Sequence, residues 1–418
     1  MTRTLPYWRL SGFYFAYFAL LGGVAPFLAL YFHHLGFSAA RIGELIAIPM
    51  IMRCLAPSLW GWLGDRTGQR LLIVRLGALA TAVCFTGIFL RQDYLWLAII
   101  MALHSFFWHA VLPQFEAITL AHLGERSARY SQIRLWGSVG FIATVVGLGW
   151  FLEYRSLDLY PAAMLGIMIA IFCCSLLVPA PQRVTQQEAG EQGDGFLRQL
   201  RQPGVLAFFL SAALMQLSHG PYYTFLSLHL EALGYTRGTI GLMWALGVLA
   251  EIMLFMVMTR VLARWTLKQL LVGSFLLASL RWLLLGTLAD QMMVLVLAQL
   301  LHAATFGSFH VGAVHFVQRQ FTAQTQGQGQ AFYATLSGLG GALGALYAGY
   351  SWNTLGPTLT FVLASLATLL AAGLLICRLR GDTSGRDGEL SAGAEECDTG
   401  RTDAEGGADG HAGRIPGR

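Results

Sequence analysis

Long apolar segments alternate with short polar ones along most of this chain. A helix needs about 20 apolar residues to cross the hydrocarbon core of a membrane, and twelve segments come close to that length. They are residues 7–31, 40–62, 71–90, 94–122, 130–152, 157–178, 204–231, 238–262, 267–288, 291–317, 328–350 and 355–377. The pattern predicts an all-α integral membrane protein with twelve transmembrane helices.

A polar stretch, residues 181–203, separates the predicted helices into two sets of six. We therefore expect an N-terminal six-helix bundle over residues 1–180 and a C-terminal six-helix bundle over residues 204–377, joined by a cytoplasmic linker. Residues 378–418 are rich in Gly, Asp and Glu and lack apolar periodicity. Such a composition cannot bury enough apolar surface to fold, so we expect a disordered cytoplasmic tail.

The two halves carry a repeated pattern. Leu35-Gly36-Phe37-Ser38 is followed by Ile42-Gly43, and 198 residues later Leu233-Gly234-Tyr235-Thr236 is followed by Ile240-Gly241. The same offset pairs His104 with His302. A duplication of this kind predicts two pseudo-symmetric bundles with a ligand site between them, near the middle of the membrane.

Composition agrees with a membrane protein. Hydrophobic residues make up 56% of the chain and charged residues only 12%, whereas soluble domains carry about 25% charged residues. The six cysteines show no spacing typical of a metal site or a disulfide framework, so we expect no metal.

The basic residues indicate an orientation. If the N-terminus is cytoplasmic, the external connections hold only Arg41, Arg91, Arg155 and Arg237, and the other basic residues of loops and helix ends lie inside. This bias is the positive-inside rule. Both termini are therefore predicted to be cytoplasmic.

A few charged residues fall inside the predicted spans, namely Arg53, Glu116, Arg134, Glu251 and Arg281. Such a group costs at least about 2.5 kcal/mol at mid-membrane, so it is normally paired and functional. We expect these side chains to form a polar network inside the bundles.

Glu116 and Arg134 lie on neighbouring antiparallel helices at similar depth, so they can pair. Ser138 follows Arg134 by one helical turn and shares its face. A guanidinium binds a carboxylate through two parallel hydrogen bonds, which predicts a substrate site. The alternative is a static salt bridge between two helices.

Glu251, Arg281 and His302 lie deep in the C-terminal spans. A buried carboxyl group can hold a proton, and a neighbouring arginine can favour its release. We expect the three residues to couple proton movement to transport. For His302 alone, an ordinary interior histidine is an equal alternative.

Helix breakers and aromatic residues coincide in two spans. His219-Gly220-Pro221 is predicted to interrupt helix seven, and Gly22-Gly23 with Pro26 is predicted to interrupt helix one. Interruptions are tolerated where a cavity or protein satisfies the backbone. Tyr17 and Tyr222 lie on aromatic faces of these two spans, and Phe306 shares a face with His302 in the span 291–317. The three are predicted to line a central cavity and to contact substrate there, although packing is an alternative.

The stretch from Gly61 to Arg70 joins two apolar segments and is predicted to form a tight turn at the cytoplasmic surface. Its pattern G-x-L-x-D-R-x-G-x-R is similar to the loop signature between helices two and three of major facilitator superfamily transporters. The resemblance implies a gating role for the matching residues, which are Gly61, Asp65, Arg66, Gly68 and Arg70.

Several segments resemble a narrower group, the phenylpropionate permeases, and more distantly the oligosaccharide/lactose–proton symporters. They are residues 130–138, 244–251, 280–282 and 302–310. The resemblance implies substrate binding by Glu116 and Arg134, and coupling by Arg281 and His302. The lactose-type carboxylates are absent at two positions, where Val248 and Thr305 stand.

The sequence thus predicts a proton-coupled symporter, not an enzyme, that imports a small organic solute across a bacterial inner membrane. An aromatic carboxylate such as 3-phenylpropionate is the expected substrate, and the proton is the expected coupling ion, with no cofactor. We expect a monomer in the lipid bilayer that binds no nucleic acid. The alternatives are a sugar or nucleoside symporter, and less favoured, a drug/proton antiporter.

Overall fold

The computed structural model describes residues 5–181, 195–322 and 324–379, and every regular element in these ranges is helical. The N-terminal half contains α1 (Tyr7–His34), α2 (Ala39–Thr67), α3 (Arg70–Phe85), η1 (Thr86–Phe89), α4 (Tyr94–Leu123), η2 (Gly124–Arg129), α5 (Tyr130–Tyr154), η3 (Leu157–Leu159) and α6 (Tyr160–Leu177). The C-terminal half contains α7 (Gly195–Leu200), α8 (Pro203–Ser218), α9 (Gly220–Ala232), α10 (Arg237–Arg264), α11 (Leu267–Thr287), α12 (Met292–His302), η4 (Ala303–Gly307), α13 (Ser308–Gln320), α14 (Gln326–Thr354) and α15 (Gly356–Arg378). The predicted linker and tail fall largely outside the described residues.

Eleven spans in the described chain are long and apolar enough to cross a membrane. The remaining predicted span is α14, a helix of 29 residues whose many glycines and polar residues lower its hydropathy. Small residues of this kind let helices approach closely inside a membrane protein. The predicted all-α membrane fold is confirmed, and α14 completes the twelve helices.

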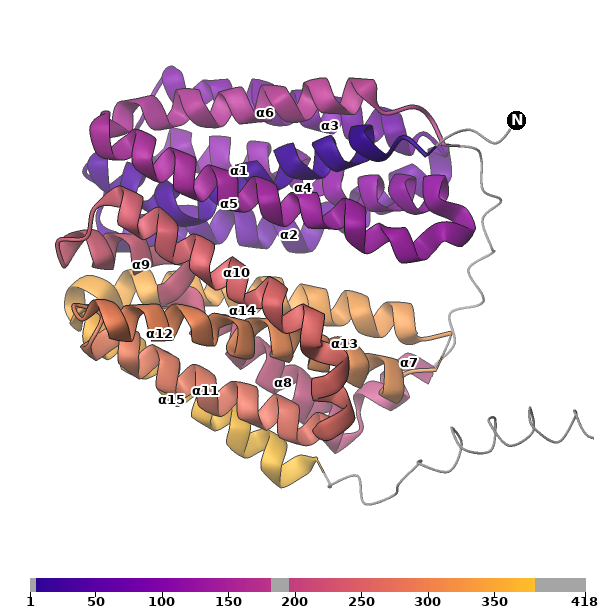
Figure 1. Ribbon diagram of the computed structural model, residues 1–418, viewed down its shortest axis with the longest axis vertical. Coiled ribbons are helices and arrows are strands. Elements are labelled where there is room, and N and C mark those ends of the chain that lie inside the picture. The colour runs from indigo at the N-terminus through magenta and orange to yellow at the C-terminus, as the bar shows by residue number, and fades with distance from the viewer. Residues whose placement is uncertain (1–4, 182–194, 323, 380–418) are drawn as a thin grey trace, which may run out of the picture. The chain divides into compact units, whose positions relative to one another are not determined.

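The helices gather into two bundles, each with its own hydrophobic core. One core is built mainly from α1 to α6 and the other mainly from α8 to α15. Figure 1 shows the N-terminal helices, in indigo to magenta, on one side and the C-terminal helices, in pink to yellow, on the other.

The repeated sequence pattern forms the same turn twice. Gly36 and Gly234 adopt φ values of 84° and 90°, a left-handed conformation that glycine adopts without a steric penalty. Ser38 and Thr236 then cap α2 and α10 by accepting hydrogen bonds from backbone N–H groups three residues on. The two turns lie at the end of the bundles opposite Tyr7, which we call the distal end.

At the distal end α2 packs against α14 almost backbone to backbone. A Cβ atom on Gly43 would lie 2.5 Å from the carbonyl oxygen of Ala345, and one on Gly349 would lie 3.0 Å from the Cα of Gly43. Tyr350 of α14 also donates a hydrogen bond to Glu44 of α2. Only glycine permits such an approach.

The pair formed by α5 and α10 repeats this arrangement. A Cβ atom on Gly241 would clash with the carbonyl oxygen of Val145, and one on Gly149 would lie 2.7 Å from the carbonyl oxygen of Arg237. The Arg237 side chain donates to the carbonyl oxygen of Leu152 at 2.9 Å. Two glycine contacts therefore join the bundles at the distal end.

Replacing Gly149 by valine is expected to lower the unfolding temperature of the purified protein, because overpacking a close contact costs about 1–3 kcal/mol. Gly147→Val is the matched control: it lies on the same helix, two residues away, with open space around its Cβ position. Equal thermal unfolding of the two variants would show that the α5–α10 contact does not hold the bundles together.

The two predicted helix interruptions have different outcomes. The chain breaks between α8 and α9 at His219, as predicted. The prediction for helix one was wrong, because α1 continues without a break through Pro26. Gly22 and Gly23 instead allow close packing of neighbouring helices, since a Cβ atom on Gly22 would clash with the Phe141 backbone and one on Gly23 with the Met164 side chain.

Candidate functional site

Arg134 lies in the first turns of α5, half-buried beside α1. Its guanidinium carbon is 3.8 Å from the ring centre of Phe18 and 5.7 Å from that of Tyr14. Gly137 makes this position possible, because a Cβ atom there would lie 2.7 Å from both Arg134 Nη1 and the Phe18 ring. The guanidinium therefore rests on aromatic faces, an arrangement that stabilises a cation.

Glu116 of α4 is near Arg134 but does not form an ion pair with it. The Glu116 carboxylate accepts a hydrogen bond from the Tyr130 hydroxyl at 3.2 Å, and its charge and that of Arg134 act on each other at longer range. Among the described residues no salt bridge joins the two. The static salt bridge considered from the sequence is therefore not formed in this structure.

Glu251 of α10, in the opposite bundle, is a second carboxylate within range of the Arg134 charge. The Arg134 charge acts on Glu251, and the Glu251 side chain lies beside Gly307, since a Cβ atom on that glycine would be 3.3 Å from Glu251 Cγ. The sequence predicts Arg281 as the arginine that acts on Glu251. The charges of Arg281 and Glu251 both act on Tyr222 and Tyr223, and the action of Arg281 on Glu251 stays a prediction.

Tyr17 belongs to the same region. Its ring is buried, its hydroxyl donates to the carbonyl oxygen of Trp108 at 3.4 Å, and the charges of Arg53, Glu116 and Arg134 all act on it. Ser138 is half-buried one turn after Arg134. The structure thus brings together the predicted residues of the N-terminal bundle, and we call Tyr17, Glu116, Arg134 and Glu251 the central charge cluster.

Arg281 lies in a separate group inside the C-terminal bundle. Its side chain is completely buried, its Nε donates to the carbonyl oxygen of Ala298 at 2.8 Å, and its guanidinium carbon lies 4.1 Å from the ring centre of Tyr222. Tyr222 in turn donates to Gln299 Oε1 at 3.0 Å. Tyr222, predicted to contact substrate, is therefore tied into this internal group.

His302 and Phe306 extend the group toward α13. The His302 ring stacks on Tyr222 and on Phe306, each with ring centres 5.4 Å apart, and Phe306 stacks on His310 at 6.4 Å. The helix changes directly after His302 into a π-helical turn, η4. Such turns are frequent at functional sites because they displace side chains from regular helical positions.

The sequence analysis missed two residues of these groups. Gln299 links Tyr222 to Arg281, and Tyr130 binds Glu116. Helical spacing offered a signal in both cases, since Gln299 precedes His302 by three residues and Tyr130 precedes Arg134 by four.

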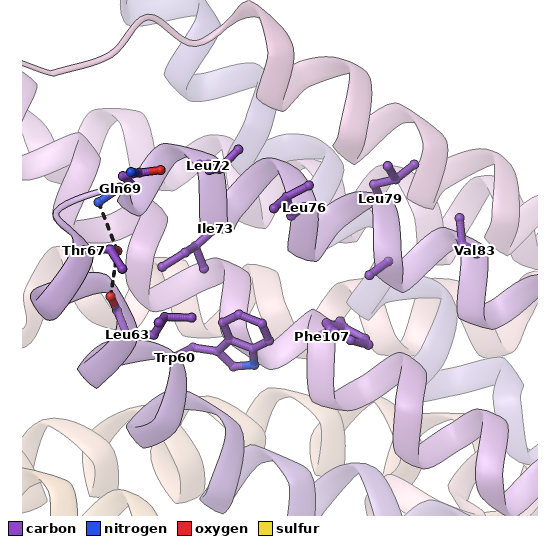
Figure 2. Close-up of a pocket in the computed structure, with 11 residues that line it drawn as sticks. Trp60, Leu63, Thr67, Gln69, Leu72, Ile73, Leu76, Leu79, Val83 and Phe107 are labelled. Carbon is purple, nitrogen blue, oxygen red and sulfur yellow. Dashed lines mark hydrogen bonds between the residues drawn. The ribbon is translucent and has the colours of Figure 1, made fainter.

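The predicted gating turn is shorter than the sequence suggested, because α2 continues to Thr67 and α3 begins at Arg70. The backbone ladder of a helix does not need apolar side chains, so α2 extends past its apolar segment. The Thr67 hydroxyl donates to the carbonyl oxygen of Leu63 and accepts from the backbone N–H of Gln69 (Figure 2). Gly68 ends α2 with φ 65°.

The charges of this turn connect it to α4. Arg70 pairs with Asp65 and also donates to Gln114 Oε1 at 3.3 Å. Gly64 also makes a close contact with α4, since a Cβ atom there would lie 2.5 Å from Gln114 Oε1. Arg66 is exposed, with its guanidinium carbon 5.4 Å from the ring centre of Trp62.

Gly68→Ala is expected to destabilise this turn by about 1–2 kcal/mol, the cost of a left-handed conformation for a residue with a Cβ atom. Gly61→Ala serves as the control, because it lies inside α2 with open space around it and alanine favours a helix. Heating both variants while following tryptophan fluorescence gives the comparison. If Gly68→Ala unfolds at the same temperature as the wild type, the turn assigned here is contradicted.

An apolar groove of about 530 Å³ lies next to the turn, between α2, α3 and α4. Figure 2 shows Trp60, Leu72, Leu76 and Phe107 around it. Its lining contains no charged residue, and it is separate from the central charge cluster. We therefore assign the candidate site to the charged side chains between the bundles.

Sequence comparison supports a transport role. The family described as "MFS_1 like family" matches residues 7–363. The "Probable 3-phenylpropionic acid transporter" of Escherichia coli (strain K12) is 25% identical over 366 residues, which is 85% of this chain and 93% of that protein. The "Maltose permease" of Geobacillus stearothermophilus is 27% identical over 380 residues, which is 88% of this chain and 94% of that protein.

Solved structures share the fold. The nucleoside transporter NupG superposes with a TM-score of 0.80 at 16% identity, covering 89% of this chain and 98% of that one. The POT family transporter PepTSo superposes with a TM-score of 0.72 at 11% identity, covering 90% and 98%. At these identities the similarity establishes the architecture alone.

Proposed function

The chain belongs to the MFS_1 like family and is a multi-pass membrane transporter, not an enzyme, and from this membership we propose that it is a proton-coupled symporter for a small aromatic carboxylate. The resemblance to major facilitator transporters predicted from the sequence is thereby confirmed. The proposal adds a substrate class, a coupling ion and a role for each charged residue.

One observation supports the substrate class above all. The Arg134 guanidinium rests on the rings of Phe18 and Tyr14 and forms no salt bridge among the described residues. A guanidinium in a partly desolvated site binds a carboxylate through two hydrogen bonds, and the neighbouring aromatic rings suit an aryl group. An aromatic acid matches both features.

Glu251 is proposed to carry the proton. It is half-buried, and its charge balances that of Arg134 from the opposite bundle. When the substrate carboxylate binds Arg134, two negative groups compete for one cation, so protonation of Glu251 becomes favourable. Binding of the acid and of the proton would then support each other, which is the requirement for symport.

The remaining predicted residues are proposed to assist. Phe306 contacts the aryl group at the edge of the site, Arg281 and His302 respond to the charge on Glu251 through Tyr222 and Tyr223, and Ser138 assists Arg134. The transport cycle would break the glycine contacts at the distal end and close the opposite end, with the turn around Gly68 as a latch. We propose a monomer in a bacterial cytoplasmic membrane, both termini cytoplasmic, with no cofactor besides the proton.

A sugar symporter is the second candidate. Glu116 accepts a hydrogen bond from a tyrosine, and a carboxylate of this kind also binds sugar hydroxyl groups. The similarity to a maltose permease favours this alternative over nucleoside transport and over drug antiport.

Uptake into proteoliposomes distinguishes these functions. We expect labelled 3-phenylpropionate to accumulate when the lumen is made alkaline and to leak out when a protonophore is added. Accumulation of maltose but not of the aromatic acid would support the second candidate. Uptake of the aromatic acid that does not depend on the pH gradient would contradict proton coupling but would still support the proposed substrate class.

A further inference from the structure

Arg281 carries a charge that its surroundings do not neutralise. The side chain is 0% exposed, and no salt bridge among the described residues involves it. Its contacts are the carbonyl oxygen of Ala298, Gln299 Oε1 at 3.5 Å, and the rings of Tyr222 and Trp282. All of these groups are neutral, and a buried charge without a counter-charge is costly.

The same place contains several buried polar atoms without a hydrogen-bond partner. They are Arg281 Nη1, Gln299 Nε2, His302 Nδ1 and His219 Nε2. The first two can only donate hydrogen bonds, whereas His219 Nε2 is an acceptor, because His219 Nδ1 donates to the carbonyl oxygen of Met215 at 2.8 Å. The unpaired donors therefore belong to Arg281 and Gln299. Buried donors are normally satisfied, which indicates that an acceptor belongs here.

These side chains form one group. Arg281 and Gln299 are hydrogen-bonded, the His302 ring stacks on Tyr222, and the His219 ring meets Trp282 edge to face at 4.8 Å. Solvent does not reach this group, because Gln299 is 0%, His219 1% and His302 5% exposed. Gly247 contributes by bringing α10 close, since a Cβ atom there would lie 3.4 Å from His302.

We propose that Arg281 and Gln299, with His302 beside them, bind a small monovalent anion of the size of chloride inside the C-terminal bundle. The anion supplies the missing acceptor and the missing negative charge together. A water molecule would satisfy the donors and leave the charge uncompensated. An aromatic acid is too large for a site closed by buried rings, so this site differs from the one at Arg134 and does not depend on the transported substrate.

The internal repeat provides a comparison. The offset of 198 residues places His104 at the position of His302, and His104 Nδ1 is also buried without a partner. It places Val83 and Met101 at the positions of Arg281 and Gln299. The N-terminal bundle thus has the histidine without the charge and the amide, and we expect no anion there.

The test is thermal unfolding of the full-length purified protein in sodium chloride or sodium bromide, compared with sodium gluconate at equal ionic strength. We expect the halides to raise the unfolding temperature in a saturable manner. In Gln299→Leu the apparent halide affinity should fall roughly tenfold or more, since a lost hydrogen bond to a charged group costs about 1.5–3 kcal/mol. Arg281→Gln should abolish the response, and the control His104→Gln should keep it.

Two results would overturn the proposal. One is equal unfolding of the wild type in halide and gluconate, which would mean that water alone occupies the site. The other is a halide response that Gln299→Leu and Arg281→Gln both retain, which would place the anion elsewhere. If Arg281→Gln does not fold, Gln299→Leu and anomalous diffraction from bromide-soaked wild-type crystals decide, with a bromide peak beside Arg281 expected and its absence contradictory.

Discussion

Glu251→Gln is expected to abolish accumulation of substrate against a gradient while leaving exchange of substrate across the membrane intact. The amide keeps the size and hydrogen-bonding capacity of the side chain but cannot take up and release a proton. A pH difference of one unit supplies about 1.4 kcal/mol per proton, enough for about tenfold accumulation of a co-transported solute. The variant should lose this factor entirely.

Two assays separate coupling from binding for this variant. Proton-driven uptake should fall to the level of empty liposomes, whereas counterflow between two substrate pools should persist. Asp290→Asn is the control, because Asp290 is an exposed acid between α11 and α12. This variant should accumulate substrate normally. Undiminished accumulation by Glu251→Gln would remove Glu251 from the coupling mechanism.

Arg134→Gln is expected to weaken substrate binding roughly a hundredfold. The reason is the loss of a paired, charge-assisted interaction with the substrate carboxylate, which is worth about 3 kcal/mol. The substrate affinity of Arg134→Lys should lie between those of Arg134→Gln and the wild type, because lysine keeps the charge without the planar two-pronged geometry. The measurement is the concentration dependence of counterflow or of thermal stabilisation by 3-phenylpropionate.

The control for charge alone is Arg91→Gln. Arg91 is exposed and pairs with Asp93 at 2.9 Å, so its loss should leave the affinity unchanged. An unchanged affinity in Arg134→Gln as well would mean that the substrate carboxylate binds another cation or that the substrate carries no carboxylate.

Much of the fold could be predicted from the sequence because the membrane restricts the possible structures. A helix satisfies its own backbone hydrogen bonds in lipid, so apolar length alone located the spans, and the repeated glycine turns at Gly36 and Gly234 located the two halves. The error at α1 has a physical cause. Proline and glycine permit a break without requiring one, and neighbours from α5 and α6 pack against Gly22 and Gly23.

The sites were less predictable, because sequence gives the depth of a charge and not its neighbour. Glu116, Arg134 and Glu251 were identified by their burial cost, yet the partnership of Glu251 with Arg134 depends on how two bundles meet. Arg281 was assigned to the same network, and its guanidinium lies on the ring of Tyr222, a side chain on which the Glu251 charge also acts. Gln299 was missed because an uncharged amide carries no comparable signal.

A structure of the protein with bound 3-phenylpropionate would show directly whether Arg134 holds the substrate carboxylate. We expect the substrate carboxylate on the guanidinium of Arg134, between Glu116 and Glu251, with the substrate ring against the aromatic side chains of α1. A carboxylate found on Arg281, or a ligand in the apolar groove beside Trp60 with Arg134 untouched, would contradict it.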